Sequence, residues 1–223
     1  MGDAIVVGPI RRRTIDTVFI ALGAVVAIVL AVAGGLLTWG SRFADDYVGD
    51  ELTAQNIFFP DRVSLEGEGR DDLVGYAGEQ VTNGDEAEAY ASYIDGHLAD
   101  IAEGATYADL GSVERTANAA VEEAVTAGAS EDEVAELQAA ADEVSGQRQS
   151  LFRGETLRGL LLSTFAWSTI GRIAGIASIA AFAAAAVMLA LVVLGAVHRR
   201  SLRSPATQAD GAPSLASPNG SSA

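Results

Sequence analysis

The stretch TVFIALGAVVAIVLAVAGGLLTWGS, residues 17–41, decides the fold together with a second stretch of the same kind, IAGIASIAAFAAAAVMLALVVLGAV, residues 173–197. Each stretch has 25 residues and no charged side chain. Because about 20 predominantly apolar residues suffice for a helix to cross the hydrocarbon core of a bilayer, each stretch is long enough to span it. The sequence therefore predicts a two-pass membrane protein.

The segment between the two spans is strongly acidic, with 27 Asp and Glu residues but only six Arg residues in residues 42–155. The whole chain has a formal net charge of −16, no Cys and no Lys. Phosphate binding needs clustered basic residues, so this segment argues against a nucleic-acid partner. Without Cys the chain has no disulfide, thiolate metal site or thiol nucleophile.

Basic residues flank the spans on the sides that face away from the acidic segment. Three Arg residues occupy positions 11–13, and three more lie within residues 199–203. Because Lys and Arg beside a span favour the cytoplasmic side, we expect both termini to be cytoplasmic and the acidic domain to be outside the plasma membrane. Trp39 and Trp167 would then lie near the outer interface, where Trp is enriched.

The first span has an alternative interpretation as a cleaved signal peptide. Ala31-Val32-Ala33 is an A-x-A pattern at a plausible distance from the preceding Arg residues. The apolar stretch continues to Trp39, however, which is beyond the usual length of a signal core, and this favours a retained span.

Arg172 also has two interpretations. It is either a charge inside the membrane, which would mark an ion path or a partner contact, or an interfacial residue whose stem points outward. Arg172 precedes His198 by 26 positions, and a helix of that length extends about 39 Å. The interfacial interpretation is therefore favoured.

Amphipathic patterns predict three helices in the acidic segment, which would pack as a small bundle. Gly128 is expected to end the second of them. The pairs predicted to cap their N-termini are Asp85 with Glu88, Thr106 with Asp109, and Ser130 with Glu133. The apolar positions at helical spacing are Tyr90, Tyr93, Ile94, Leu98 and Ile101, then Leu110, Val113, Ala117, Val121 and Ala124, then Val134, Leu137, Ala141, Val144 and Leu151.

The remaining segments complete an all-α organisation with two transmembrane helices. Residues 55–60, QNIFFP, predict a short extended piece with two core Phe residues, residues 61–72 a loop, and residues 73–81 a short helix. Small residues such as Ala27, Ala31, Gly171 and Gly175 favour close packing of the spans, either with each other or with a partner. The chain is thus divided into a cytoplasmic N-terminus (1–16), transmembrane helix 1 (17–41), an acidic extracytoplasmic helical domain (42–156), an interfacial helix (157–172), transmembrane helix 2 (173–197) and a disordered cytoplasmic tail (198–223).

The chain contains no pattern that indicates catalysis. Its two histidines, His97 and His198, are predicted on opposite sides of the membrane, so they cannot share a two-His-one-carboxylate iron site. Without Lys there is no phosphate-binding GxxxxGK loop, and no G-x-S-x-G elbow is present. The adjacent acidic pairs are typical of solvated surface. We assign no catalytic, cofactor-binding or metal-binding residue and no cofactor.

Four segments carry a family resemblance: QNIFFP at 55–60, YAG at 76–78, AEAYA at 87–91 and, above all, LFRGETLRGLLL at 151–162. With these segments the chain resembles a family of two-pass membrane proteins of actinobacteria, many of which carry the name aromatic ring-opening dioxygenase. The resemblance runs from the first span to the end of the second. It implies the two-pass organisation but no established activity and no site residues. The dioxygenase name conflicts with the histidine count, so we do not assign that activity.

These observations favour a non-enzymatic accessory or scaffold subunit. Its partners would be the lipid bilayer and another membrane or envelope protein, bound through the outer helical domain. The alternative is an envelope sensor that binds a ligand or ion and signals through a partner, since an inner tail of 26 residues is too short for a kinase. The sequence leaves the oligomeric state open.

Overall fold

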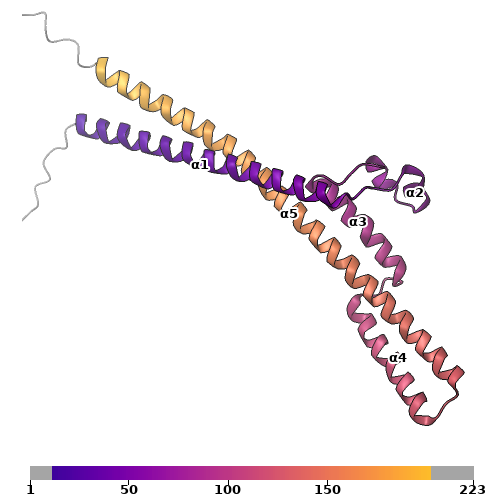
Figure 1. Ribbon diagram of the computed structural model, residues 1–223. Helices are drawn as coiled ribbons and strands as arrows, with labels where there is room; N and C mark the ends of the chain where they lie inside the picture. The colour runs from indigo at the N-terminus through magenta and orange to yellow at the C-terminus, as the bar shows by residue number, and fades with distance from the viewer. Residues whose placement is uncertain (1–11, 202–223) are drawn as a thin grey trace, which may run out of the picture. The chain divides into compact units, whose positions relative to one another are not determined.

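The computed structural model describes residues 12–201, and all of its named elements are helices (Figure 1). This confirms the all-α class. The predicted N-terminal residues 1–11 and the tail residues 202–223 lie outside the described residues. The elements are α1 (Arg12–Gln55), α2 (Arg62–Gly67), the 3-10 helix η1 (Asp71–Tyr76), α3 (Gly84–Ile101), α4 (Tyr107–Ala127) and α5 (Glu131–Ser201).

Two of these helices, α1 and α5, are long and apolar enough to cross a membrane. Only 11% of the most apolar window of α1 and 6% of that of α5 is buried. A core helix of a soluble protein buries most of its apolar surface, so exposure on this scale suggests helices that face lipid. The structure thus supports a membrane protein with two spanning helices and a small helical segment between them.

One compact unit comprises the first part of α1, up to Thr38, and the last part of α5, from Ile176. The two helices are antiparallel and approach closely at glycines: a Cβ atom on Gly23 would lie 2.9 Å from Val192, and one on Gly34 would lie 3.1 Å from Phe182. Of the two predicted alternatives, the structure shows packing of the two helices with each other. Ala27 lies in this contact, whereas Ala31 is exposed.

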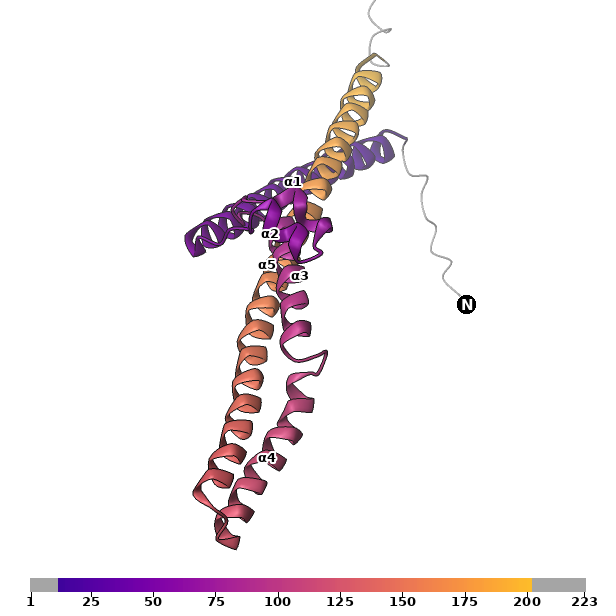
Figure 2. The same ribbon diagram turned by 90° about the vertical axis from the view of Figure 1, so that its right-hand side faces the viewer.

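The second compact unit comprises residues 39–175. Helix α4 and the first part of α5 form an antiparallel hairpin, and α4 ends at Gly128 in the left-handed conformation, as expected. Helices α3 and α4 follow one another along α5 (Figures 1 and 2). Glycine contacts give the same order, because Gly111 faces Arg148 and Gly154 faces Leu98. The predicted three-helix bundle is thus corrected to a hairpin with one arm interrupted at residues 102–106.

The capping predictions were right for α4 and wrong for α3. Thr106 and Asp109 form a complete capping box, in which each side chain accepts a hydrogen bond from the backbone N–H of the other residue. The N-cap of α3 is Asn83, whose side chain accepts from the N–H of Glu86 at 3.0 Å, and not Asp85. The pair Asn83 and Glu86 has the same spacing as the predicted pair, so the pattern alone did not distinguish them.

For α5, half of the predicted box is present. The hydroxyl of Ser130 accepts a hydrogen bond from the N–H of Glu133 at 3.3 Å. The predicted stripe of α5 faces inward throughout, with Ala141 and Leu151 buried.

Two apolar clusters form the core of the second unit. Ala87 and Ala91, in the first half of α3, are buried, while the predicted positions Ile101 and Val113 are exposed. Small residues occupy the core side of the first half of α3, where the helix lies close to its neighbours, and the large Leu98 is buried in the second half. The first cluster consists of Val48, Leu52, Phe59, Val81, Ala87, Ala91 and Leu161, and the second of Leu98, Ala102, Leu110 and Leu151.

The connection between α1 and α3 differs from the prediction in three places. Phe59 is buried as predicted, but Phe58 is 49% exposed, because neighbouring residues of an extended segment point to opposite sides. Residues 61–72 were predicted to be a loop, yet they contain α2, which the side chain of Asp61 caps and whose Leu65 is fully buried. The predicted helix at 73–81 is limited to η1.

Helix α5 is continuous for 71 residues. It includes the predicted third helix, the predicted interfacial helix and the predicted second span. The second unit extends to Gly175 and therefore includes residues 157–172. Placement of those residues on a membrane surface stays a prediction.

Candidate interaction surface

Three aromatic side chains form a stacked ladder on one face of α1. Trp39, Phe43 and Tyr47 follow one another at intervals of four residues, which places them on the same side of a helix. The ring centroids of Trp39 and Phe43 are 5.8 Å apart, and those of Phe43 and Tyr47 are 6.0 Å apart. All three side chains are more than half exposed. Contiguous exposed apolar patches mark sites of contact with another protein or with the membrane, so the ladder is a candidate contact site.

The ladder borders an apolar groove between α1 and α5, within the second unit. The groove has a volume of about 700 Å³, which lies in the range of ordinary ligand pockets. At its floor the two backbones are close, since a Cβ atom on Gly171 would lie 2.9 Å from that of Ala44. The groove is thus lined by small residues where the two helices approach and by the rings of Phe43, Tyr47 and Trp167 elsewhere. Its lining residues are Gly40, Phe43, Ala44, Tyr47, Val48, Trp167, Ile170, Gly171 and Ala174.

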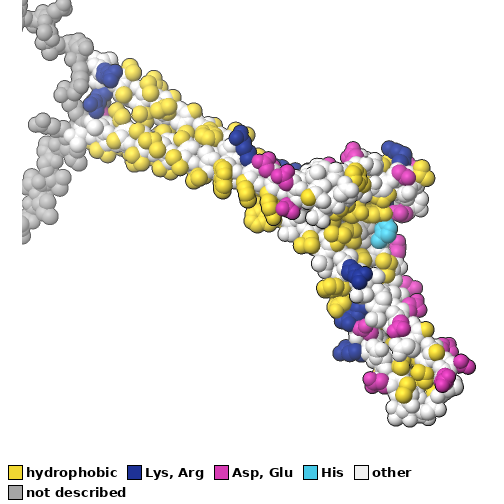
Figure 3. All heavy atoms as spheres, viewed as in Figure 1, with side chains coloured by type: hydrophobic (Ala, Val, Ile, Leu, Met, Phe, Trp, Pro, Cys, Tyr) yellow, Lys and Arg dark blue, Asp and Glu magenta, His cyan; other side chains and the backbone are white. Residues whose placement is uncertain are grey.

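Acidic side chains continue the same face of α1. Asp46 and Asp50 follow Trp39 and Phe43 by seven residues, which is two helical turns, and therefore share their side of the helix. Both are exposed, and within residues 12–201 neither forms an ion pair. The surface shows the same change from apolar to acidic side chains. Hydrophobic side chains cover the long helices of the first unit, and acidic side chains are concentrated on the second unit (Figure 3).

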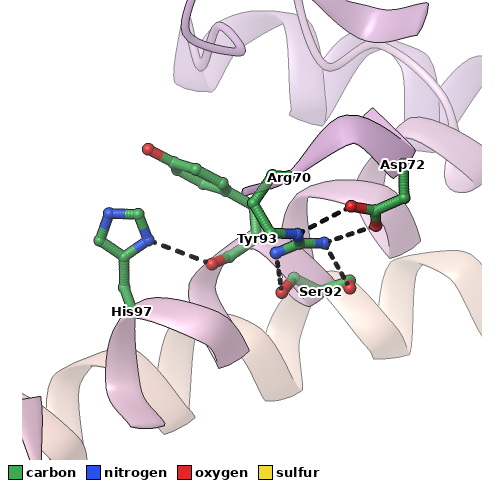
Figure 4. A network of polar contacts seen from close by, with 5 residues as sticks. All are labelled: Arg70, Asp72, Ser92, Tyr93 and His97. Carbon is green, nitrogen blue, oxygen red and sulfur yellow. Dashed lines mark hydrogen bonds and ion pairs between the residues drawn. The ribbon is translucent and has the colours of Figure 1, made fainter. Parts of the chain in front are cut away.

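A polar network around Arg70 attaches the connection to α3 (Figure 4). The Arg70 guanidinium donates to both carboxylate oxygens of Asp72, at 3.0 and 2.8 Å, and to the carbonyl and hydroxyl of Ser92, at 2.8 and 2.9 Å. The hydrogen bond from Arg70 lowers the pKa of Asp72. Because four donor contacts are satisfied within the protein, this network is a structural clamp and not an open binding site.

His97 lies beside this clamp as a half-exposed residue next to the tyrosines. Its ring is 4.5 Å from that of Tyr93, and its Nδ1 atom is 3.3 Å from the Tyr93 carbonyl oxygen (Figure 4). Its Nε2 atom is 3.9 Å from the Glu68 carboxylate. Burial, together with Glu68, raises the pKa of Tyr93. Within residues 12–201 no group of three His, Cys, Asp or Glu side chains is arranged to hold a metal.

A third polar cluster stabilises the α4–α5 hairpin. Arg148 pairs with Glu114, and its guanidinium carbon lies 4.2 Å from the centre of the Tyr107 ring. Hydrogen bonds from Ser145 and Arg148 lower the pKa of Glu114. The cation–π contact and the ion pair together hold α4 on α5.

Comparison with protein-family models, curated proteins and solved structures finds no match for this chain. The resemblance to the actinobacterial family therefore stays a prediction.

Sequence analysis identified Trp39 and Trp167 but missed Phe43 and Tyr47. The signal that could have identified the ladder is the interval of four residues from Trp39 to Phe43 and from Phe43 to Tyr47, which continues past the end of the first apolar stretch.

Proposed function

We propose that this chain is a non-enzymatic, two-pass protein of the plasma membrane, with both termini cytoplasmic, that acts as an accessory or scaffold subunit. In this proposal it binds a helix of another membrane protein in the groove beside the aromatic ladder. The observation that carries the proposal is the groove itself, with its exposed rings and its floor of small residues.

The shape of the groove suits a helix. Small residues such as Gly40 and Gly171 allow a third backbone to approach two helices closely, which is how helices associate where water does not drive their contact. Trp and Tyr are among the residues that carry most of the binding energy at protein interfaces, and Phe is enriched in interface cores. Trp and Tyr are also the residues enriched at the level of the lipid headgroups, where the proposed topology places Trp39 and Trp167.

The charges restrict the partner further. Because Asp46 and Asp50 lie on the same side of α1 as the ladder and have no cationic partner in residues 12–201, they favour a partner with Arg or Lys just outside its apolar span. Complementary charge of this kind sets specificity and register at an interface. The expected occupant is thus a transmembrane helix with a basic outer flank.

Site-specific crosslinking in the native host tests this assignment. The photoreactive residue p-benzoylphenylalanine is placed at position 43 or 167, and the matched control carries it at Val125, which is 60% exposed on α4. We expect positions 43 and 167 to give the same adduct, mapped by mass spectrometry to an apolar helix with a basic flank, and position 125 to give none. Adducts only with lipid, only with a second copy, or equally at position 125 would contradict the proposal.

Purification in gentle detergent provides a second test. The full-length chain is isolated from its host, and co-purifying proteins are quantified by mass spectrometry. We expect one membrane protein in a fixed ratio, reduced in the Phe43→Ala and Asp46→Asn variants and unchanged in Val63→Ala, which changes an exposed residue of α2 that does not line the groove. A chain that purifies alone from every preparation would contradict the subunit role and favour the sensor alternative.

A further inference from the structure

The inner ends of α1 and α5 enclose a second groove, which belongs to the first unit and is separate from the aromatic groove. Its volume is about 330 Å³. The two helices are close at its floor, where a Cβ atom on Gly23 would lie 2.9 Å from Val192 and one on Gly195 would lie 3.3 Å from Ile20. The lining residues are apolar along most of the groove, namely Phe19, Ile20, Gly23, Met188, Leu191, Val192 and Gly195, and polar at one end, namely Asp16, His198 and Arg199.

We propose that this groove binds an anionic phospholipid of the cytoplasmic leaflet, with an acyl chain along its apolar part and the phosphate at Arg199 and His198. The inference rests on the proposed function in one respect, because it requires these helix ends to lie at the cytoplasmic surface.

The contacts of the Arg199 guanidinium support an anionic ligand. Its guanidinium donates a hydrogen bond of 2.9 Å to the hydroxyl of Thr17, a neutral group. No carboxylate among residues 12–201 forms an ion pair with Arg199, although Asp16 lines the same groove. Among residues 12–201 the positive charge is therefore held by a neutral contact, so an anion in the groove would be its charged partner. A guanidinium is well suited to phosphate because its donors match the phosphate oxygens.

Charge complementarity extends beyond the groove. The two segments next to the inner helix ends, residues 11–16 and 198–203, contain six Arg residues and one acidic residue, Asp16. Anionic lipids are attracted to basic segments beside a span, and basic sites between helices on the cytoplasmic side bind their headgroups. The combination of an apolar channel and a basic end selects a lipid, whereas a free phosphate would use only the basic end.

Lipid retention by the purified full-length chain tests the proposal. The protein is exchanged into detergent with equal amounts of phosphatidylglycerol and phosphatidylcholine, and the lipids that remain bound are counted by native mass spectrometry. We expect phosphatidylglycerol to be retained at least about fivefold over phosphatidylcholine. We expect Arg199→Gln to remove most of this preference, and Arg153→Gln, which changes an exposed Arg of the second unit, to leave it intact.

A second pair of variants tests the apolar part of the groove at exposed positions, where a larger side chain does not disturb the packing of the protein. Leu191 lines the groove and is 57% exposed, whereas Leu189 is 56% exposed and lies outside the lining. Leu191→Trp should occupy the groove and reduce retention, while Leu189→Trp should not.

Three outcomes would overturn the assignment: equal retention of both lipids, unchanged retention in Arg199→Gln, or displacement of phosphatidylglycerol by excess inorganic phosphate alone. Failure here is distinguishable from failure of the proposed function, because lipid retention is measured on the isolated chain and crosslinking at position 43 depends on the partner.

Discussion

Arg172 and Asp85, which are 87 positions apart, form a two-point ion pair in which the guanidinium donates to both carboxylate oxygens at 2.7 and 3.3 Å. The pair joins α5 to the first turn of α3, where a carboxylate also suits the positive end of the helix dipole. Both side chains are about half exposed, and the partner of Arg172 belongs to the acidic segment. The pair therefore supports the interpretation of Arg172 as a residue at the boundary of the span.

Reversal of one charge in this pair should lower the stability of the fold more than removal of the charge does. Because both side chains are about half exposed, Asp85→Asn should lower the melting temperature of the detergent-solubilised chain only slightly. Arg172→Asp should lower it further, since the new carboxylate would face Asp85. The double variant Asp85→Arg with Arg172→Asp should recover part of this loss. Strictly additive effects in the cycle would show that the two side chains do not interact.

Loss of the Arg70 clamp should release the connection between α1 and α3. Arg70→Gln removes the four contacts to Asp72 and Ser92, and we expect a loss of about 1–2 kcal/mol in unfolding free energy, with faster proteolysis within residues 61–82. Arg62→Gln is the matched control, because the Arg62 pair with Glu66 is an exposed contact within one helix. If both variants resisted protease like the unchanged chain, Arg70 would not hold this segment.

Acid should weaken the start of α4 through Asp109. Hydrogen bonds from the hydroxyl and the backbone N–H of Thr106 lower the pKa of Asp109 below its ordinary value of 3.8. A carboxyl with a lowered folded-state pKa stabilises the fold above its unfolded-state pKa, and this contribution is lost as the pH falls through the folded-state pKa. The loss is therefore expected below about pH 3.8.

Titration of the Asp109 carboxyl by NMR, in the unchanged chain and in Thr106→Val, measures this effect. The variant keeps a side chain of similar shape but has no hydroxyl, so the pKa of Asp109 should rise toward 3.8. An unchanged pKa in the variant would show that the hydroxyl does not contribute.

The sequence predicted those parts of the fold that depend on local patterns. Uncharged length identified both spanning helices, and the spacing of Thr106 and Asp109 identified the start of α4. Helix α2 was missed because its six residues are stabilised by tertiary burial of Leu65 and by the Asp61 cap, and a short polar segment gives no periodic signal. Similarly, no pattern indicates which of Phe58 and Phe59 faces the core.

The candidate surface was only partly predictable, for a different reason. Trp39 was expected at an interface from its type and position, but the ladder depends on ring stacking with Phe43 and Tyr47, and the groove on the approach of Ala44 to Gly171. The second relationship joins residues more than 120 positions apart. One sequence contains no information on such a pairing beyond the abundance of small residues, which arises for other reasons in a chain rich in Ala and Gly.

Glycine substitutions in the second unit should separate close helix contacts from ordinary helix propensity. A Cβ atom on Gly84 would overlap Ser168 Cβ and lie 3.4 Å from the Phe165 backbone, whereas one on Gly159 would meet nothing within 4 Å. Gly159→Ala should therefore stabilise the chain by about 0.5–1 kcal/mol, because Ala favours a helix. Gly84→Ala should destabilise it by about 1–3 kcal/mol, because α3 must move away from α5. Gly154→Ala should fall between them, since the Leu98 side chain it would meet can rotate away. Denaturant midpoints of the three full-length variants in one detergent provide the comparison, and a gain of stability in Gly84→Ala would show that α3 and α5 are farther apart than the structure places them.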